Sequence, residues 1–241
     1  TGSGFNFDSL AADVSVNVLS AVFKKYEYRN LLVNGRLQQK QFSGKVSIND
    51  KNLEFNYEGR LSFDPKTPNY VFTLDLKGAD LKALNLTEQE LRVSALIQSD
   101  IHGRSDKNFT GKASIKNALI VRDNKKYPLD SLVFISEFKE GSSRISLRSE
   151  IMTADFKGDI IMNQLPSALK QLVNNYFRME DPSAASHTDA QKFTFEIKLL
   201  DASLLTKNLV PELKSLSPFS LKGGFDTRAK KLELKADVPQ V

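Results

Sequence analysis

Strict alternation of apolar and polar residues marks the stretch from Leu53 to Phe63. Its even positions are all polar, and its odd positions are apolar or glycine: Leu53, Phe55, Tyr57, Gly59, Leu61 and Phe63. Because a strand points successive side chains to opposite faces, this stretch predicts a β-strand with one apolar and one polar face.

The same period of two recurs along the chain and predicts an all-β fold, with the strands joined as an antiparallel meander. Residues 49–52, Asn-Asp-Lys-Asn, are typical of a turn. The further strands that the alternation predicts lie at Val14 to Val18, Tyr26 to Leu37, Phe42 to Ile48, Tyr70 to Leu76, Leu91 to Ile101, Leu132 to Phe138, Ile145 to Ile151, Ala154 to Ile160, Phe193 to Leu199, Phe219 to Phe225 and Leu232 to Val238.

Two stretches of the chain repeat earlier ones. Phe109 to Ile115 matches Phe42 to Ile48 at five of seven positions. Phe193 to Lys198 likewise resembles Phe72 to Lys77. Units of roughly 60 residues that follow one another are typical of architectures that extend in one direction rather than closing into a globule.

Helical spacing is limited to short segments, so the predicted class is all-β with one or two short helices. Leu165 to Phe177 keeps its apolar residues on one side and predicts an amphipathic helix. Ser203 to Leu216 is a broken helical patch, and Ala79 to Leu84 is helix-like in composition. The predicted parts in order are residues 1–4, which look like a cloning scar, a repeated β-sheet segment at 5–164, the helix at 165–178, a loop or linker at 179–190, and a continuing β-sheet segment with a short helical insertion at 191–241.

The composition argues against several classes of function. The 241 residues include 34 basic and 29 acidic ones, and the formal net charge of +5 is spread over short clusters. A nucleic-acid surface needs a concentrated basic stripe with stacking aromatics, so no nucleic-acid partner is predicted.

The chain has no cysteine, which excludes disulfides and thiolate chemistry. No apolar run approaches the roughly 20 residues that span a bilayer. No signal peptide is visible, and we expect the chain to be a piece of a longer protein.

Residues that could carry chemistry are sparse. His102 lies in a predicted turn and His187 in the loop, and neither has a partner at metal-ligand or triad spacing. No phosphate-binding glycine loop or zinc-protease motif occurs. The carboxylates mostly lie on the polar faces of strands, although folding could still bring a catalytic pair together, as in glycosidases. The prediction is therefore a protein that is not an enzyme and has no catalytic residue, no metal and no cofactor.

Several short motifs together resemble one known family. The resemblance is to the TamB family of translocation and assembly modules, in the version found in Bacteroidota and within the AsmA-like superfamily, and it is clearest from Val14 to Phe177. The motifs that carry it are Lys25 to Leu31, Val33 to Leu37, Phe42-Ser43-Gly44, Ala79-Asp80-Leu81, Leu84-Asn85-Leu86, Ala154 to Gly158 and Asn175-Tyr176-Phe177.

The resemblance implies an elongated, curled antiparallel sheet, a half-pipe or β-taco, whose concave face is apolar. It implies a protein anchored in the inner membrane of a Gram-negative bacterium that crosses the periplasm and carries phospholipid toward the outer membrane. It also implies a β-barrel partner of the Omp85 type in the outer membrane. The membrane anchor and the partner-docking end of such proteins have no counterpart here, so we expect an internal fragment.

Physical reasoning gives the apolar face of the strands a role in such a protein. One continuous apolar face can keep acyl chains dry while the head group stays in water. The predicted helix either plugs such a groove or completes a core, through Leu169, Leu172, Val173, Tyr176 and Phe177. The residues predicted to line the groove are Leu53, Phe55, Tyr57, Leu61, Phe63, Phe72, Leu74, Leu76, Leu91, Val93, Ile97, Phe193, Phe195, Ile197 and Leu199.

Three alternatives to a lipid groove stay open. The apolar face could pack against a second sheet in an ordinary sandwich. The protein could be a scaffold or chaperone that pairs an exposed strand edge with outer-membrane β-barrel segments. It could also be a structural or adhesive β-solenoid with a filled core.

Overall fold

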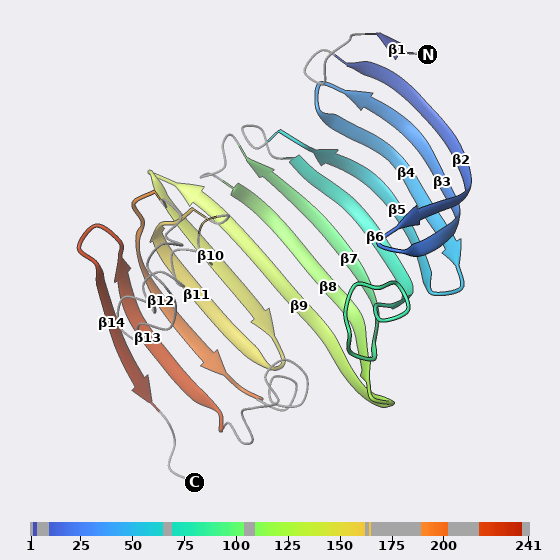
Figure 1. Cartoon of the computed structure of the whole chain (residues 1–241). Coiled ribbons are helices and arrows are strands. Elements are labelled where there is room, and N and C mark those ends of the chain that lie inside the picture. The colour runs from blue at the N-terminus through green and yellow to red at the C-terminus, as the bar shows by residue number, and fades with distance from the viewer. Residues whose placement is uncertain are drawn as a thin grey trace. The chain divides into compact units, whose positions relative to one another are not determined.

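The computed structural model describes residues 2–3, 10–64, 69–103, 109–161, 164, 189–201 and 217–237. These residues form an all-β fold in which the strands follow one another through a single antiparallel sheet in the order of the sequence (Figure 1). The strands are β1 (Gly2–Ser3), β2 (Ala11–Phe23), β3 (Tyr26–Gln38), β4 (Gln41–Asp50), β5 (Leu53–Ser62), β6 (Asn69–Asp80), β7 (Leu91–Gly103), β8 (Phe109–Arg122), β9 (Lys125–Lys139), β10 (Ser142–Ser149), β11 (Met152–Asp159), β12 (Lys192–Leu199), β13 (Phe219–Asp226) and β14 (Lys231–Asp237).

The meander expected from the alternating pattern is therefore confirmed, and none of the described residues belongs to an α-helix. The predicted helix at 165–177 and the helical patch at 203–216 lie outside the described residues, as does most of the predicted loop at 179–190.

The helix-like expectation for residues 79–84 is wrong. Ala79 and Asp80 end strand β6, and residues 81–86 form turns. Asp80 starts a single helical turn, in which its carbonyl accepts a bond from the Leu84 amide at 3.0 Å. Asn85 then adopts a φ of 57°, which is incompatible with a continuing right-handed helix.

Tight turns fix the register of the hairpins. Both central residues have positive φ in the turns Lys24-Lys25 (48° and 64°), Gln39-Lys40 (49° and 62°) and Asp123-Asn124 (49° and 62°). This is the pattern of a type I′ turn, whose twist matches that of the strands it joins. Lysine and glutamine are unusual at such positions, so the residue types of the first two turns did not predict a tight turn.

The contacts divide the chain into two compact units. The N-terminal unit contains Thr1–His102 and Gly111–Val133, and the C-terminal unit contains Gly103–Thr110 and Phe134–Val241. In the C-terminal unit a cluster of buried residues forms a core, to which half-buried Phe134, Phe156, Ile197, Leu221 and Leu232 add. The members of this core are Ile145, Ile160, Phe193, Phe195 and Phe225. The buried apolar residues of the N-terminal unit are fewer, namely Ile48, Ala79 and Leu84 among those described.

Candidate functional site

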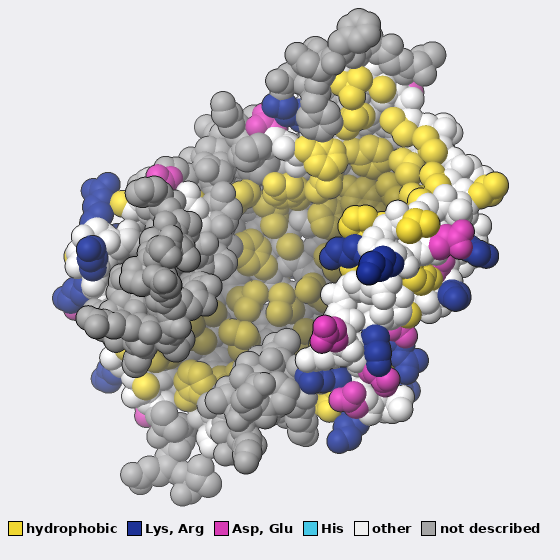
Figure 2. Space-filling view, viewed as in Figure 1, with side chains coloured by type: hydrophobic (Ala, Val, Ile, Leu, Met, Phe, Trp, Pro, Cys, Tyr) yellow, Lys and Arg dark blue, Asp and Glu magenta, His cyan; other side chains and the backbone are white. Residues whose placement is uncertain are grey.

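Cross-strand register brings the predicted residues of the N-terminal unit together on one face. Residues directly opposite each other in antiparallel strands project to the same side of a sheet. Strands β3 to β7 align three apolar rows, which we call the N-terminal apolar face. The rows are Leu31-Ile48-Phe55-Leu76-Ala95, Val33-Val46-Tyr57-Leu74-Ile97 and Leu37-Phe42-Leu61-Tyr70-Ile101. Figure 2 shows hydrophobic side chains gathered over these strands, at the upper right of the view.

The predicted residues of this unit are neither buried nor fully exposed. Leu53, Leu91 and Val93 are half-buried, as are the predicted members of the three rows and Phe72. Phe63 is the exception, with 50% of its surface exposed. Strands β3 and β4 contribute a part of the face that was not predicted, although Val33, Val46 and Ile48 show the same period of two.

Glycines form a further row between the apolar ones. Gly35 lies opposite Gly44, and Gly44 lies opposite Gly59. A Cβ atom on Gly44 would lie 2.3 Å from the Asn34 carbonyl oxygen, and one on Gly35 would lie 2.8 Å from the Phe42 ring. The glycines therefore allow the strands and an aromatic ring to approach more closely than any side chain would permit. Each of these glycines falls where the alternation expects an apolar residue, and this position in the pattern could have indicated the glycine row from the sequence.

Aromatic rings flank the glycine row. Tyr57 lies between Phe42 and Phe72, with ring centroids 6.4 Å and 5.5 Å away. The hydroxyl of Tyr57 is buried and has no hydrogen-bond partner. Burial also raises the pKa of Tyr57 above its ordinary value, because the charged form would lose its hydration. The aromatic part of the face therefore surrounds an unpaired hydroxyl.

One end of the N-terminal apolar face is crossed by the tip of the β2–β3 hairpin, residues 19–29, which we call the β2–β3 ribbon. Strand β3 pairs with β4 only from Leu31 onward, while β2 and β3 stay paired as far as Phe23 and Tyr26. Asn30, with a φ of 55°, forms the corner, and its side chain donates to the Asn49 carbonyl at 3.0 Å. Figure 1 shows the ribbon turning across the ends of the neighbouring strands.

Asp50 holds this ribbon against the sheet. Its carboxylate accepts hydrogen bonds from the Tyr26 hydroxyl, from the Arg29 amide at 3.1 Å and from the Asn52 amide at 2.9 Å. Asp50 lies opposite Leu53 and two residues from Ile48, so its side chain is on the apolar face. Burial disfavours the carboxylate, but the three hydrogen bonds outweigh it, and the pKa of Asp50 lies below its ordinary value.

The loop between β6 and β7 completes this closed end. The Asn85 side-chain amide donates to the Lys24 carbonyl in the ribbon at 3.1 Å. Leu84 next to it is only 1% exposed. The ribbon and the loop thus cover the apolar face where β4, β5 and β6 meet their turns.

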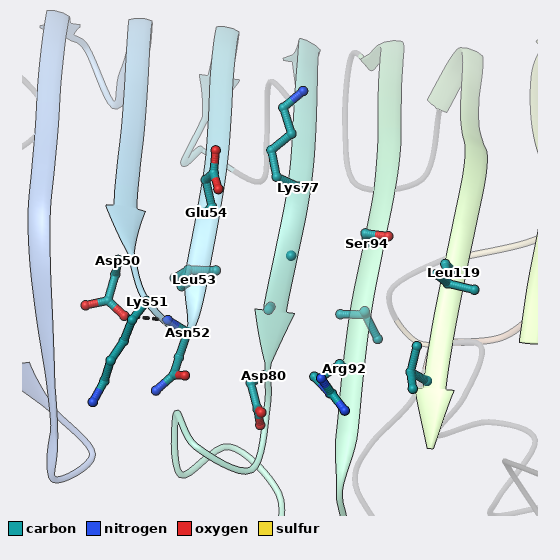
Figure 3. A pocket seen from close by; sticks show the side chains of 14 residues that line it. Asp50, Lys51, Asn52, Leu53, Glu54, Lys77, Asp80, Arg92, Ser94 and Leu119 are labelled. Atoms are coloured by element: carbon teal, nitrogen blue, oxygen red, sulfur yellow. Dashed lines mark hydrogen bonds between the residues drawn. The ribbon is translucent and has the colours of Figure 1, made fainter. Parts of the chain in front are cut away.

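A cleft of about 370 Å³ lies beside a bulge in β6 of the same unit. The register shifts between Leu76 and Ala79, and a Cβ atom on Gly78 would meet nothing within 4 Å. Figure 3 shows the charged side chains of Lys77 and Arg92 among those that line the cleft. Lys77 pairs with Asp75 at 2.6 Å, so its charge is compensated on the surface. The cleft has a mixed lining, in which the apolar side chains of Leu53, Val93 and Leu119 lie beside charged ones.

The predicted residues of the C-terminal unit have different surroundings. Phe193, Phe195 and Leu199 are buried, and Ile197 is half-buried. Phe193 stacks on Phe225 with ring centroids 4.8 Å apart. Phe193 and Phe195 belong to the core cluster of that unit, and Ile197 packs against it. The role of all four residues as groove lining stays a prediction.

Groups that could bind a metal or perform catalysis do not gather in the described part of the chain. His102 forms a pair with Asp100 at 2.8 Å and is exposed, while His187 lies outside the described residues. The described residues contain no group of three potential metal ligands. They also contain no helix with the length and hydropathy of a membrane span.

Comparison with known proteins adds no relative: the chain matches no protein family, no curated protein and no solved structure.

Proposed function

We propose that this chain is a segment of a periplasm-spanning protein that shields phospholipid acyl chains during transport between the inner and outer membranes. The N-terminal apolar face is the site, and no residue acts as a catalyst. The proposal agrees with the resemblance to the TamB family, which implies the same cargo and location. In this reading an Omp85-type barrel is the partner of the full-length protein.

The physical need for such a face follows from the cost of wetting a lipid. Each methylene group exposed to water costs about 0.8 kcal/mol, so two acyl chains with about 30 methylenes would cost tens of kcal/mol. A sheet face of sufficient width removes this cost without a pocket specific for one lipid. The lipid then moves along the face by diffusion.

The observation that carries the proposal is the half-burial of the N-terminal apolar face. A sandwich or a filled solenoid would bury side chains such as Tyr57, Leu74 and Ile97, whereas here they stay partly accessible. Large contiguous apolar patches that stay accessible usually mark a binding surface. The described strands also belong to one sheet, so they offer no second sheet to cover the face.

The opposite face of the same strands suits contact with water. Lys45 and Glu58 face each other across β4 and β5 with an ion pair of 3.2 Å. Lys116 on β8 donates to the Gln98 side chain on β7 at 3.1 Å. A sheet with one such polar face can curve around a lipid and stay soluble, and the proposed half-pipe is the curved form of this arrangement.

A second candidate function rests on a strand edge. Beyond Ala11 and Ala12, which pair with β1, strand β2 pairs only with β3 among the described residues. Unpaired edges accept strands from other chains. A scaffold that assembles outer-membrane β-barrel segments by adding strands to this edge is therefore the alternative.

Native mass spectrometry of the purified chain, together with lipid extraction, tests the lipid proposal. We expect phospholipid to copurify with the parent chain and to be lost from the double variant Phe55→Asp and Phe72→Asp. The matched control is Asn56→Asp with Thr73→Asp, which adds the same charges to the exposed face of the same strands. A folded parent that holds no phospholipid and takes up none on addition would sink the proposal and favour the scaffold.

A further inference from the structure

The tip of the β2–β3 ribbon carries an unusual concentration of exposed apolar side chains. Leu19 is 75% exposed, Val22 is 74% exposed and Phe23 is 60% exposed. No other large apolar side chain in the described part of the chain reaches the exposure of these three. Exposed apolar side chains scattered singly are ordinary, but three of them near the tip of one hairpin, with Val22 and Phe23 on opposite faces of it, indicate a contact surface around the tip.

The charges of the ribbon are mostly positive. Lys24 and Lys25 form its turn, and the Lys24 ammonium lies 5.9 Å from the centroid of the Phe23 ring. The single acidic residue of the ribbon, Glu27, is paired with Arg29 at 2.9 Å. The tip therefore presents apolar side chains next to two lysines, and the acid opposite Val22, Glu27, is paired with Arg29.

The ribbon is held firmly enough to present this tip. Asp50 binds the Tyr26 hydroxyl and the Arg29 amide at the base, and Asn85 binds the Lys24 carbonyl at the turn. Leu86, which follows Asn85, is also exposed and extends the apolar surface toward the loop. The exposed side chains thus belong to an anchored element.

From these observations we infer that the tip docks on the surface of a membrane that contains anionic lipids. Valine, leucine and phenylalanine side chains can enter the boundary between head groups and acyl chains, while lysines reach the lipid phosphates. A stable protein interface buries about 800 Å² on each partner, which is large for a two-residue turn and its neighbours. The inference goes beyond the proposed function, because docking does not require a lipid on the apolar face.

A single tryptophan can report the docking directly, since the chain contains none. In the intact chain, Phe23→Trp places the reporter at the tip, and Leu234→Trp places it on β14 at a position of similar exposure, 57%. We expect vesicles of equimolar phosphatidylcholine and phosphatidylglycerol to shift the emission of the Phe23→Trp chain to the blue. The Leu234→Trp emission should stay unchanged. Adding Val22→Ser and Lys24→Gln to the tip reporter should weaken vesicle binding by about tenfold or more, and salt should weaken it further.

Each outcome decides the inference. No shift with anionic vesicles overturns it, and the exposed tip then serves a protein partner. Equal shifts of the two reporters also overturn it, since adsorption would not be specific to the tip. Phospholipid bound to the same preparation is counted by mass spectrometry, so a chain that carries lipid without docking refutes this inference alone. A chain that docks without carrying lipid refutes the proposed function alone.

Discussion

The two units use the same alternating pattern to different ends. In the N-terminal unit Tyr57 and Leu74 stay half-buried on a face built from five strands. In the C-terminal unit Phe193 and Phe225 are 3% and 2% exposed, and they stack on each other inside a core. A period of two therefore specifies which face is apolar, but it does not specify whether anything covers that face.

The difference also separates stability from binding. Burying a large apolar side chain completely contributes about 1.5–3 kcal/mol, whereas a half-buried one leaves part of that free energy available to a ligand. Among the described residues, the C-terminal unit buries more of its apolar side chains in a core of its own. The N-terminal unit leaves apolar surface accessible, and this surface is the physical basis of the proposed lipid site.

The largest expected effect is the loss of stability when a cavity is made in the buried core of the C-terminal unit, compared with the same truncation on the half-buried face of the N-terminal unit. Phe225→Ala should lower the free energy of unfolding by about 3–5 kcal/mol, because it empties a fully buried position. Phe72→Ala on the N-terminal apolar face should cost about 1–2 kcal/mol, since its ring is only half-buried. Urea unfolding followed by circular dichroism measures both values. Equal losses would show that the two faces are covered to the same degree, and the contrast would be wrong.

An intermediate effect concerns the glycine row. Gly44→Ala would place a Cβ atom 2.5 Å from the Cα atom of Gly35, and we expect a loss of about 1–3 kcal/mol from overpacking. The control is Gly78→Ala, where the added atom meets nothing within 4 Å. That control should leave thermal stability unchanged or raise it by about 0.4–1 kcal/mol through the unfolded chain. Similar melting temperatures for the two variants would argue against the close approach of β3 and β4.

The smallest effect sharpens the comparison at a single atom. Tyr57→Phe removes a buried hydroxyl that has no partner, so the free energy of unfolding should stay unchanged or rise by up to about 1 kcal/mol. Tyr26→Phe removes a hydroxyl bonded to Asp50 and Asn52, and it should cost about 0.5–1.5 kcal/mol. Thermal melts of both variants provide the measurement. A large loss from Tyr57→Phe would mean that its hydroxyl has a partner after all.

Prediction from sequence succeeded where the physics is local. The alternation from Leu53 and the turn before it depend on neighbouring residues. The structure has the strand at Leu53–Ser62 and a turn at 51–52, while Asn49 and Asp50, which were predicted in the turn, end strand β4. The corner at Asn30 could not be predicted, because it depends on distant acceptors: the Asn49 carbonyl for the Asn30 side chain and the Asp50 carboxylate for the Arg29 amide. The burial of Phe193 was equally out of reach, since it depends on stacking against Phe225, which lies opposite it on the neighbouring strand β13.

The site was predictable in part for the same reason. The lining residues of β5, β6 and β7 share one face, as their alternation requires, although their role is still a proposal. The closed end formed by the ribbon was missed, because nothing in the segment from Leu19 to Arg29 indicates that it leaves the sheet.

The simple strand order has a consequence for how the chain folds and grows. Each strand pairs with its neighbours in sequence, so the contacts that build the sheet are local. Low contact order favours rapid folding, which can begin at any hairpin and spread to the next. Such a sheet can also be lengthened by duplicating one hairpin, because the new strands need no change in topology. The similarity between Phe42 to Ile48 and Phe109 to Ile115 is what growth by duplication would leave behind.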